Sequence, residues 1–527
     1  MAQCLSAECL QQIISYLEGD NKSLHSCLLV NRFWCYNTVS TLWSRPWCFY
    51  EITQTSATSL IQTYVDCLSE EAKINLYSNG IICRNHLKSA PLIFDYPSFL
   101  RSLDYDYMYW TISQWLVSCW LYRVLNYEEE VNECQTDRIE DCIIRFAPDE
   151  RFNNDEYNEI EEENERKTIL VARELCNLFK NRCRTFHDLH LENKAIQSNE
   201  FLFLPSSTDP CNYLTNLRQL VCLGDNKSEL LLAISEVCKN LRKVSIGFPL
   251  ALQWKSHYES DAMSLGTLIE KQTRLESVCL YGYKRLISYL IGSLLSQSMS
   301  LNILELMYTD FREAQDYQSL ALLPSCKNLK SLKIHNCFIP PDERIMPLTS
   351  LQQLEEFDFC NEWNPLYPLI QQKFWDELFL NNANTLRKLS LWWVRSDSKD
   401  GAKIIESITK RCSKNISILH LPILFTHEIL TLFDHCRQLK EFSFSGDDLD
   451  ANEFLSQLGA FTPTTLRSLT IKDGHSGGWN FTEKSLYSFL SSCQAKLQIM
   501  DLTSCSCMTD RHYDVISRRG IINCLHK

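Results

Sequence analysis

Apolar residues recur at a fixed spacing through the last two-thirds of the chain. The spacing is apolar-x-x-apolar-x-apolar, and twelve segments carry it. Alternating apolar positions within each segment are typical of a short β-strand with one buried face. The pattern therefore predicts twelve strands, each of which needs a neighbour to cover its apolar side. The segments are Phe186-Leu189-Leu191, Leu217-Leu220-Cys222, Leu241-Val244-Ile246, Leu275-Val278-Leu280, Leu301-Leu304-Leu306, Leu329-Leu332-Ile334, Leu354-Phe357-Phe359, Leu386-Leu389-Leu391, Ile416-Leu419-Leu421, Leu439-Phe442-Phe444, Leu466-Leu469-Ile471 and Leu497-Met500-Leu502.

The period of the pattern indicates the class of repeat. Phe186 and Leu497 are 311 residues apart over eleven intervals, a mean of about 28 residues, within the range of leucine-rich repeats. One strand and one helix per repeat predict an α/β fold, a curved, ribonuclease-inhibitor-like leucine-rich-repeat solenoid over 167–527, with parallel strands inside and helices outside. Amphipathic helices are expected before the third, ninth and tenth strands, with inward faces Leu230, Leu231, Ile234 and Val237, then Ile404, Ile405 and Ile408, then Ile429, Leu432 and Phe433.

Residues 1–50 have a different pattern, that of three short helices. Ser6 can cap the first helix, and Arg45-Pro46 ends the unit because a residue before proline is biased away from helix. Three helices of this size cannot bury much surface, so we expect the unit to lean on a partner or on the domain behind it. Its apolar positions are Leu10, Ile13, Ile14 and Leu17 in the first helix, and Leu24, Cys27 and Leu28 in the second, with the third helix running from about Phe33 to Leu42.

Residues 51–126 are predicted to be a helical linker that also caps the solenoid, because the end of a repeat stack must be covered. The stretch from Met108 to Leu125 is apolar enough to be read as a membrane span. Thr111, Ser113 and Gln114 interrupt it, however, and its apolar residues recur at the spacing of one face of a soluble helix. We therefore expect no membrane association.

The charge of the chain is concentrated in one segment. Residues 127–166 hold sixteen Asp or Glu against four Arg or Lys, a net of −12 out of −13 for the whole chain, which leaves −1 elsewhere. Such a composition predicts a solvated, mostly disordered loop, and a docking site for a basic partner is the alternative. The nearly neutral remainder lacks the basic footprint of a nucleic-acid binder.

Cysteine is abundant, at 25 residues, but its placement favours packing. The N-terminus has no basic, apolar leader, so we expect reduced thiols and a cytoplasmic or nuclear location. A cysteine that recurs just before a strand behaves as a small apolar residue, whereas zinc would need four converging ligands, so we expect no metal and no other cofactor. The recurring residues are Cys183, Cys238, Cys326 and Cys436, three residues before a strand motif, and Cys412 and Cys493, four before it.

Two segments resemble a known family. Residues 500–510, Met-Asp-Leu-Thr-Ser-Cys-Ser-Cys-Met-Thr-Asp, closely match the cysteine-containing leucine-rich repeat, in which Thr509 or Asp510 can cap the next helix. Leu5-Ser6-Ala7-Glu8-Cys9-Leu10, then Ile13-Ile14-Ser15-Tyr16-Leu17, then Val30-Asn31-Arg32-Phe33-Trp34 resemble an F-box, with Ser6 where the family usually has proline. The plan is similar to that of fungal F-box proteins with leucine-rich repeats.

This resemblance implies a substrate receptor of a cullin–RING ubiquitin ligase of the SCF type. Its F-box would bind a Skp-type adaptor, and through it a cullin, while the repeats hold a target protein for ubiquitination. The receptor contributes proximity and needs no catalytic residue, and the sequence contains no phosphate-loop, nucleophile-elbow or zinc-protease motif. A leucine-rich-repeat interaction scaffold without a ligase role is the alternative. The predicted adaptor-binding residues are Leu5, Leu10, Ile13, Ile14, Leu17, Leu24, Leu28, Val30 and Trp34.

The candidate target-binding residues lie on the concave side of the predicted strands. The third, fifth and seventh positions of the motif point there because side chains alternate along a strand. In the eighth repeat this register selects Trp392 and not Trp393, and a tryptophan beside mixed charges is a plausible anchor. Packing of the tryptophan against a neighbouring strand is the alternative. The candidates are Lys388, Trp392, His420 and Asp358.

Overall fold

The computed structural model describes residues 5–47, 54–82, 92–127, 154–192, 212–224, 227–248, 258–283, 286–311, 316–339, 343–361, 370–393, 398–446, 451–473 and 480–522. They belong to two compact units. Unit 1 comprises Met1–Lys243 and Lys271–Thr273, and unit 2 comprises Val244–Glu270 and Arg274–Lys527.

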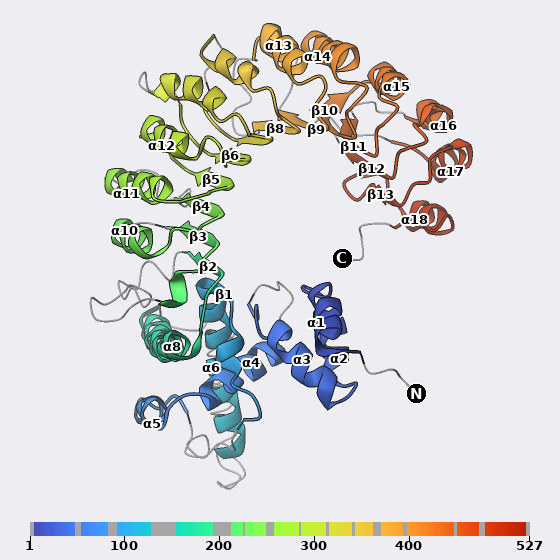
Figure 1. Ribbon diagram of the computed structural model, residues 1–527. Coiled ribbons are helices and arrows are strands. Elements are labelled where there is room, and N and C mark those ends of the chain that lie inside the picture. Colours follow the sequence, from blue (N-terminus) through green and yellow to red (C-terminus); the bar gives the residue numbers. More distant parts are fainter. Residues whose placement is uncertain are drawn as a thin grey trace. The chain divides into compact units, whose positions relative to one another are not determined.

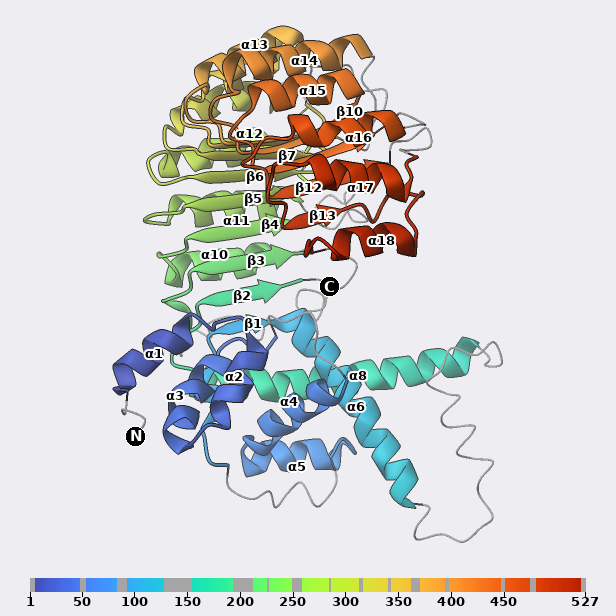
Figure 2. The same cartoon turned by 90° about the vertical axis from the view of Figure 1, so that its right-hand side faces the viewer.

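The strands form one parallel sheet in which sequence order and spatial order agree, from β1 to β13. All twelve predicted strands are present. Figure 2 shows β4 to β7 of unit 2 stacked as successive rungs. The predicted fold class is therefore confirmed. The strands are β1 Ser102–Asp104, β2 Asp188–Leu191, β3 Gln219–Leu223, β4 Lys243–Gly247, β5 Ser277–Tyr281, β6 Ile303–Met307, β7 Ser331–His335, β8 Glu356–Asn361, β9 Lys388–Trp393, β10 Ile418–Leu424, β11 Glu441–Gly446, β12 Ser468–Asp473 and β13 Ile499–Asp501.

Strand β1 is an addition to the twelve predicted strands. It pairs with β2 in parallel, with Leu103 opposite Leu189. Leu100, Leu103 and Tyr105 are all buried, so the same apolar spacing begins one repeat earlier, with tyrosine as its third member. The sequence signal was present, but it lies within the segment that was predicted to be entirely helical.

Helices connect the strands, and in unit 2 they lie on the outer side of an arc whose inner side is the sheet (Figure 1). The inward faces predicted for the helices before the third, ninth and tenth predicted strands (α10, α14 and α15 below) are buried. The exception is Val237 of α10, which is not among the buried residues. Among the described residues, a short 3₁₀ segment, η3 Asn212–Leu214, precedes β3. The connections before β7 and β8 also differ from the predicted α-helix: they are the 3₁₀ segments η6 Asp316–Ser325 and η7 Glu343–Ser350, which contain Pro324 and Pro347. Proline lacks the N–H that an α-helical interior requires. The α-helices are α10 Ser228–Val237, α11 Tyr258–Glu270, α12 Ile287–Leu294, α13 Gln372–Asn381, α14 Ser398–Arg411, α15 Thr426–His435, α16 Asn452–Phe461, α17 Glu483–Ser492 and α18 Asp510–Ser517.

Unit 1 begins with the three predicted helices and continues into a helical cap. The first three are α1 Ala7–Ser15, α2 Asn21–Leu28 and α3 Arg32–Leu42, and the cap contains α4 Gln54–Asp66, α5 Glu70–Ser78, α6 Tyr105–Tyr127 and α8 Asn154–Arg182. No described helix is long and apolar enough to cross a membrane.

The three N-terminal helices are joined to the cap by packing and by hydrogen bonds. The ring of Trp47 lies 5.5 Å from that of Tyr64 in α4 and 5.8 Å from that of Phe179 in α8. The carbonyl oxygen of Ser44 accepts the N–H groups of Arg101 and Ser102 at the free edge of β1. The chain between α3 and α4 is thus tied to both the cap and the sheet.

Helix α8 corrects part of the prediction for the acidic segment. Residues 128–153 lie outside the described residues, but residues 154–166, which were predicted as loop, form the first turns of α8. Arg166 and Lys167 both pair with Glu163, at the i+3 and i+4 spacing that stabilises helices. A helix whose C-terminal half is packed, at Val171, Leu175 and others, propagates into such a segment because glutamate is a good helix former.

The cysteines before the strands pack as predicted. Cys183, Cys238, Cys326, Cys412 and Cys436 are buried, and Cys493 is half-buried. The thiols of Cys183, Cys238, Cys412 and Cys493 donate to backbone carbonyls, as from Cys238 Sγ to Leu214 O at 3.0 Å. Burial raises the pKa of Cys412 and of Cys436 to about 12, so both thiols stay protonated at neutral pH.

Helix packing in unit 2 gives a test of the structure. A Cβ on Gly459 of α16 would lie 2.8 Å from the Cys493 backbone nitrogen and would overlap the Phe489 carbonyl oxygen. We expect Gly459→Ala to lower the free energy of unfolding by about 1–3 kcal/mol through overpacking. Gly292 of α12 has open space around its Cβ position, so Gly292→Ala should raise stability by about 0.5–1 kcal/mol. Urea unfolding of both variants measures the difference, and a stabilised Gly459→Ala variant would contradict the α16–α17 packing.

Candidate protein-binding sites

The N-terminal helices form a small core of their own. Leu10, Ile14 and Leu24 are buried, and Leu17, Trp34 and Leu42 pack against them while remaining partly exposed. Each helix starts at a polar cap, where the side chains of Ser6, Asp20 and Asn31 accept the N–H groups of Cys9, Ser23 and Trp34 at 3.3, 3.0 and 3.0 Å. Ser6, where proline is usual, therefore satisfies the helix start through a hydrogen bond.

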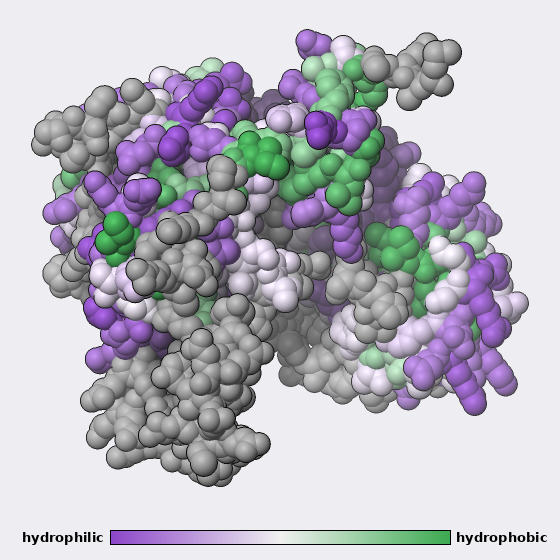
Figure 3. Space-filling view, turned by 90° about the horizontal axis from the view of Figure 1, so that it is seen from below, coloured by the Kyte–Doolittle hydropathy of each residue, from purple (hydrophilic) through white to green (hydrophobic). Residues whose placement is uncertain are grey.

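A second set of apolar residues on the same helices faces solvent. Ile13 of α1 is 42% exposed and Tyr16, the C-cap of α1, is 82% exposed, while Leu5, just before the helix, is 44% exposed. Between α2 and α3, Leu29 is 88% exposed and Val30 is 56% exposed. We call this set the exposed apolar set: Leu5, Ile13, Tyr16, Leu29, Val30, Phe33 and Tyr36. In Figure 3, apolar surface, coloured green, lies in patches between hydrophilic surface.

The nine predicted adaptor-binding residues thus fall into two groups. Leu5, Ile13 and Val30 are exposed and can meet a partner. The others build the unit or lie at its boundary: Leu10, Ile14 and Leu24 are buried, and Leu17, Leu28 and Trp34 are half-buried. Tyr16, Leu29, Phe33 and Tyr36 were not predicted, because periodicity in a short helix does not distinguish a core face from an exposed apolar face beside it.

The candidate target-binding residues are brought together on the inner face of unit 2. In consecutive strands β8, β9 and β10, Asp358 lies opposite Ser390, and Ser390 lies opposite His420. In the neighbouring rows, Lys388 lies opposite Glu356 and Trp392 lies opposite Cys360. The predicted strand register is therefore the observed one.

Charges on this face are paired across strands. Lys388 Nζ lies 2.7 Å from Glu356 Oε1, and Lys333 Nζ lies 2.6 Å from Glu305 Oε1. His335 Nε2 lies 3.1 Å from Asp358 Oδ1, at an ion-pair distance without hydrogen-bond alignment. A partner must therefore compete with these internal pairs, which favours a selective contact over general electrostatic attraction.

Trp392 is partly covered by its own chain. The Lys472 ammonium lies 4.5 Å from the centre of the Trp392 ring, and the His420 ring lies 6.3 Å away. Both neighbours come from other strands of the same face, so the alternative interpretation, in which the tryptophan packs within the sheet, holds in part. The side chain is half-buried and keeps some surface for a partner.

Three side chains on this face are hydrogen-bonded in series like a hydrolytic triad, but the serine is buried. Ser390 Oγ lies 3.2 Å from His420 Nδ1, and His420 Nε2 lies 2.9 Å from Glu441 Oε1. Ser390 is only 1% exposed, however, so its hydroxyl cannot reach a bound carbonyl carbon while His420 covers it. We interpret the series as a device that fixes the orientation of the His420 ring.

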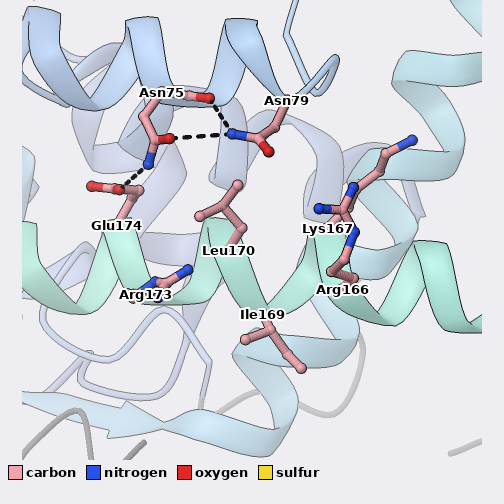
Figure 4. A pocket seen from close by; sticks show the side chains of 8 residues that line it. All are labelled: Asn75, Asn79, Arg166, Lys167, Ile169, Leu170, Arg173 and Glu174. Carbon is pink, nitrogen blue, oxygen red and sulfur yellow. Dashed lines mark hydrogen bonds between the residues drawn. The ribbon is translucent and has the colours of Figure 1, made fainter.

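An opening of about 610 Å³ lies between α5 and α8 in unit 1 (Figure 4). Its cations are engaged with neighbours: Arg166 donates two hydrogen bonds to Glu163, at 2.8 and 2.9 Å. Asn75 donates to Glu174 at 2.7 Å across the opening. Small-molecule sites are usually lined mainly by apolar and aromatic groups, so this polar opening does not indicate one.

Comparisons with known proteins identify no family. The chain matches no protein-family model and no curated protein. A chain in the crystal structure of the Rad7 and Elc1 complex in yeast aligns over 63% of this chain and 77% of its own length. The sequence identity is 16% and the TM-score 0.40, which is too small a similarity to indicate a shared function.

Proposed function

We propose that the protein is the substrate-recognition subunit of an SCF-type ubiquitin ligase. Its N-terminal helices would bind a Skp-type adaptor, and through it a cullin. The inner face of unit 2 would hold a target protein for ubiquitination by other subunits. In this role the protein acts by proximity, without catalytic residues or a cofactor of its own, in the cytoplasm or the nucleus.

The exposed apolar set is the observation that carries the proposal. A unit of three helices already has its own small core, yet it leaves seven large apolar side chains in solvent within 32 residues, from Leu5 to Tyr36. Seven exposed large apolar side chains on so small a unit are what we would expect where a partner protein covers it. It also coincides with the segment whose motifs resemble an F-box.

Copurification tests the proposal directly. The full chain, mixed with a purified Skp-type adaptor and its cullin, is expected to elute with both in size-exclusion chromatography. Elution of the chain separately from the adaptor would favour the alternative, an interaction scaffold whose N-terminal helices serve only as a folding cap.

A second experiment tests whether the inner face of unit 2 binds a target protein. Replacing Lys388, Trp392 and His420 together with alanine should abolish capture of at least one protein from lysate, because the variant removes an aromatic anchor, the lysine beside Glu356 and the imidazole beside Glu441. Asp358 is left in place so that the His335 imidazole keeps the carboxylate that lies 3.1 Å from it. A matched control replaces three exposed residues of the outer helices, Lys373, Lys484 and Tyr487. Identical sets of captured proteins for wild type and the inner-face variant would exclude this patch.

A further inference from the structure

One edge of unit 2 is strongly basic, although the chain as a whole carries −13. The five connections that lead into strands β9 to β13, taken with the last one or two residues of α14, α15, α16 and α17, span residues 382–387, 410–417, 435–440, 461–467 and 492–498. Together they contain eight Lys or Arg and no Asp or Glu. The cations are Arg387, Lys410, Arg411, Lys414, Arg437, Lys440, Arg467 and Lys496.

The parallel sheet places these connections side by side. The backbone N–H of Ser417 donates to the Arg387 carbonyl at 2.8 Å, and that of Lys440 donates to Ser417 at 2.7 Å. The row continues from Arg467 to Lys440 at 2.7 Å and from Gln498 to Arg467 at 2.8 Å. Every helix-to-strand connection enters the sheet at the amino end of a strand. The cations therefore lie along one side of the sheet, where the strands begin. We call these five connections the basic edge.

Most of these cations are available to a partner. Lys410 pairs with Glu406, Arg437 pairs with Asp434, and Arg467 donates to the carbonyls of Thr464 and Leu466. The other five are exposed and form no ion pair among the described residues: Arg387, Arg411, Lys414, Lys440 and Lys496. Like charges placed this close repel one another, and an anionic partner would relieve that repulsion.

We propose that the basic edge binds an extended acidic segment, rich in Asp and Glu, of a partner protein. Five neighbouring strands span four intervals of about 4.8 Å, and an extended segment of about six residues covers that length of about 19 Å. Phe461, which is 49% exposed at the same edge, offers an apolar contact within the segment's path.

The composition of the edge favours an acidic polypeptide over a nucleic acid. Proteins that bind single-stranded nucleic acid combine cations with several aromatic side chains on which bases stack. The five connections contain a single Phe, Tyr or Trp residue, Phe461. The whole chain also has a pI of about 5.5, whereas nucleic-acid binding domains are usually basic. The inference is independent of adaptor binding, because it concerns residues of unit 2 only.

The test uses the full chain and a fluorescein-labelled peptide of alternating Glu and Ser, with a Gln and Ser peptide as control. Fluorescence anisotropy at low salt should show binding of the acidic peptide only, weakened as salt is added. The variant Arg387→Gln, Lys414→Gln, Lys440→Gln should bind about tenfold more weakly or worse, because three surface ion pairs are lost.

A charge-matched variant separates local binding from net charge. The variant Lys373→Gln, Lys484→Gln, Arg511→Gln removes three exposed cations from the first turns of α13, α17 and α18. These turns follow the carboxyl ends of the strands, on the side of the sheet away from the basic edge. Its affinity for the acidic peptide should stay within about twofold of wild type. Equal loss in both variants, no binding of the acidic peptide by the wild type, or tighter binding of a single-stranded oligothymidine would each overturn the proposal. Unchanged melting temperatures confirm that both variants are folded.

Discussion

Replacing Ile13 and Val30 together with aspartate is expected to weaken binding of a Skp-type adaptor by about a hundredfold, about 3 kcal/mol, without lowering the melting temperature. Both side chains are largely outside the core of the unit, at 42% and 56% exposed, so the folded state loses little packing. In a complex, each aspartate would lie against apolar surface and would have to be desolvated without a partner. Isothermal titration calorimetry with purified adaptor measures the loss.

The choice of positions matters because neighbouring residues have opposite roles. Ile14 is 1% exposed in the core of the unit, so Ile14→Asp would unfold the helices and would lose binding for that reason alone. A matched control, Ile74→Asp with Tyr77→Asp, places the same charges on exposed apolar positions of α5, outside the three helices. That control should bind the adaptor like wild type. Wild-type affinity in the Ile13 and Val30 variant would exclude the exposed apolar set as the interface.

Trp47→Ala is expected to lower the free energy of unfolding of unit 1 by about 3–5 kcal/mol. The ring is 2% exposed and contacts Tyr64 and Phe179, so its loss leaves a large cavity between the end of the N-terminal helices, α4 and α8. Urea unfolding followed by circular dichroism should show a lower midpoint for the first transition. A chain of two units need not unfold in a single step, so the shift is read from the transition that reports on unit 1 and not from a single overall midpoint.

A second tryptophan provides the comparison for this variant. Trp110 of α6 is 41% exposed and stacks on Tyr107 with ring centres 5.3 Å apart. Trp110→Ala should cost about 1 kcal/mol or less, because exposed side chains contribute little to stability. If both variants unfold at the same urea concentration, Trp47 does not hold the N-terminal helices to the cap.

The repeat architecture could be predicted because its information is local. Each strand motif, such as Leu386-Leu389-Leu391, places apolar residues at the positions that a half-buried strand requires, and the regular spacing fixes which strands are neighbours. The register of the inner face follows from the same alternation, which by itself is enough to assign Lys388, Trp392 and His420 to one face. The caps at Ser6 and Thr509 also depend only on adjacent residues.

The sequence by itself therefore determined the α/β repeat class, the twelve later strands and the three N-terminal helices. The tertiary structure alone decided the division of α1 into a core side and an exposed side, since Ile13 and Ile14 have the same chemistry and differ only in their neighbours. It also decided that Lys472 covers Trp392 from three strands away. The basic edge likewise becomes a single surface only when five parallel strands stack, because no single connection contains more than three of its cations and Arg387 and Lys496 are more than a hundred residues apart in the sequence.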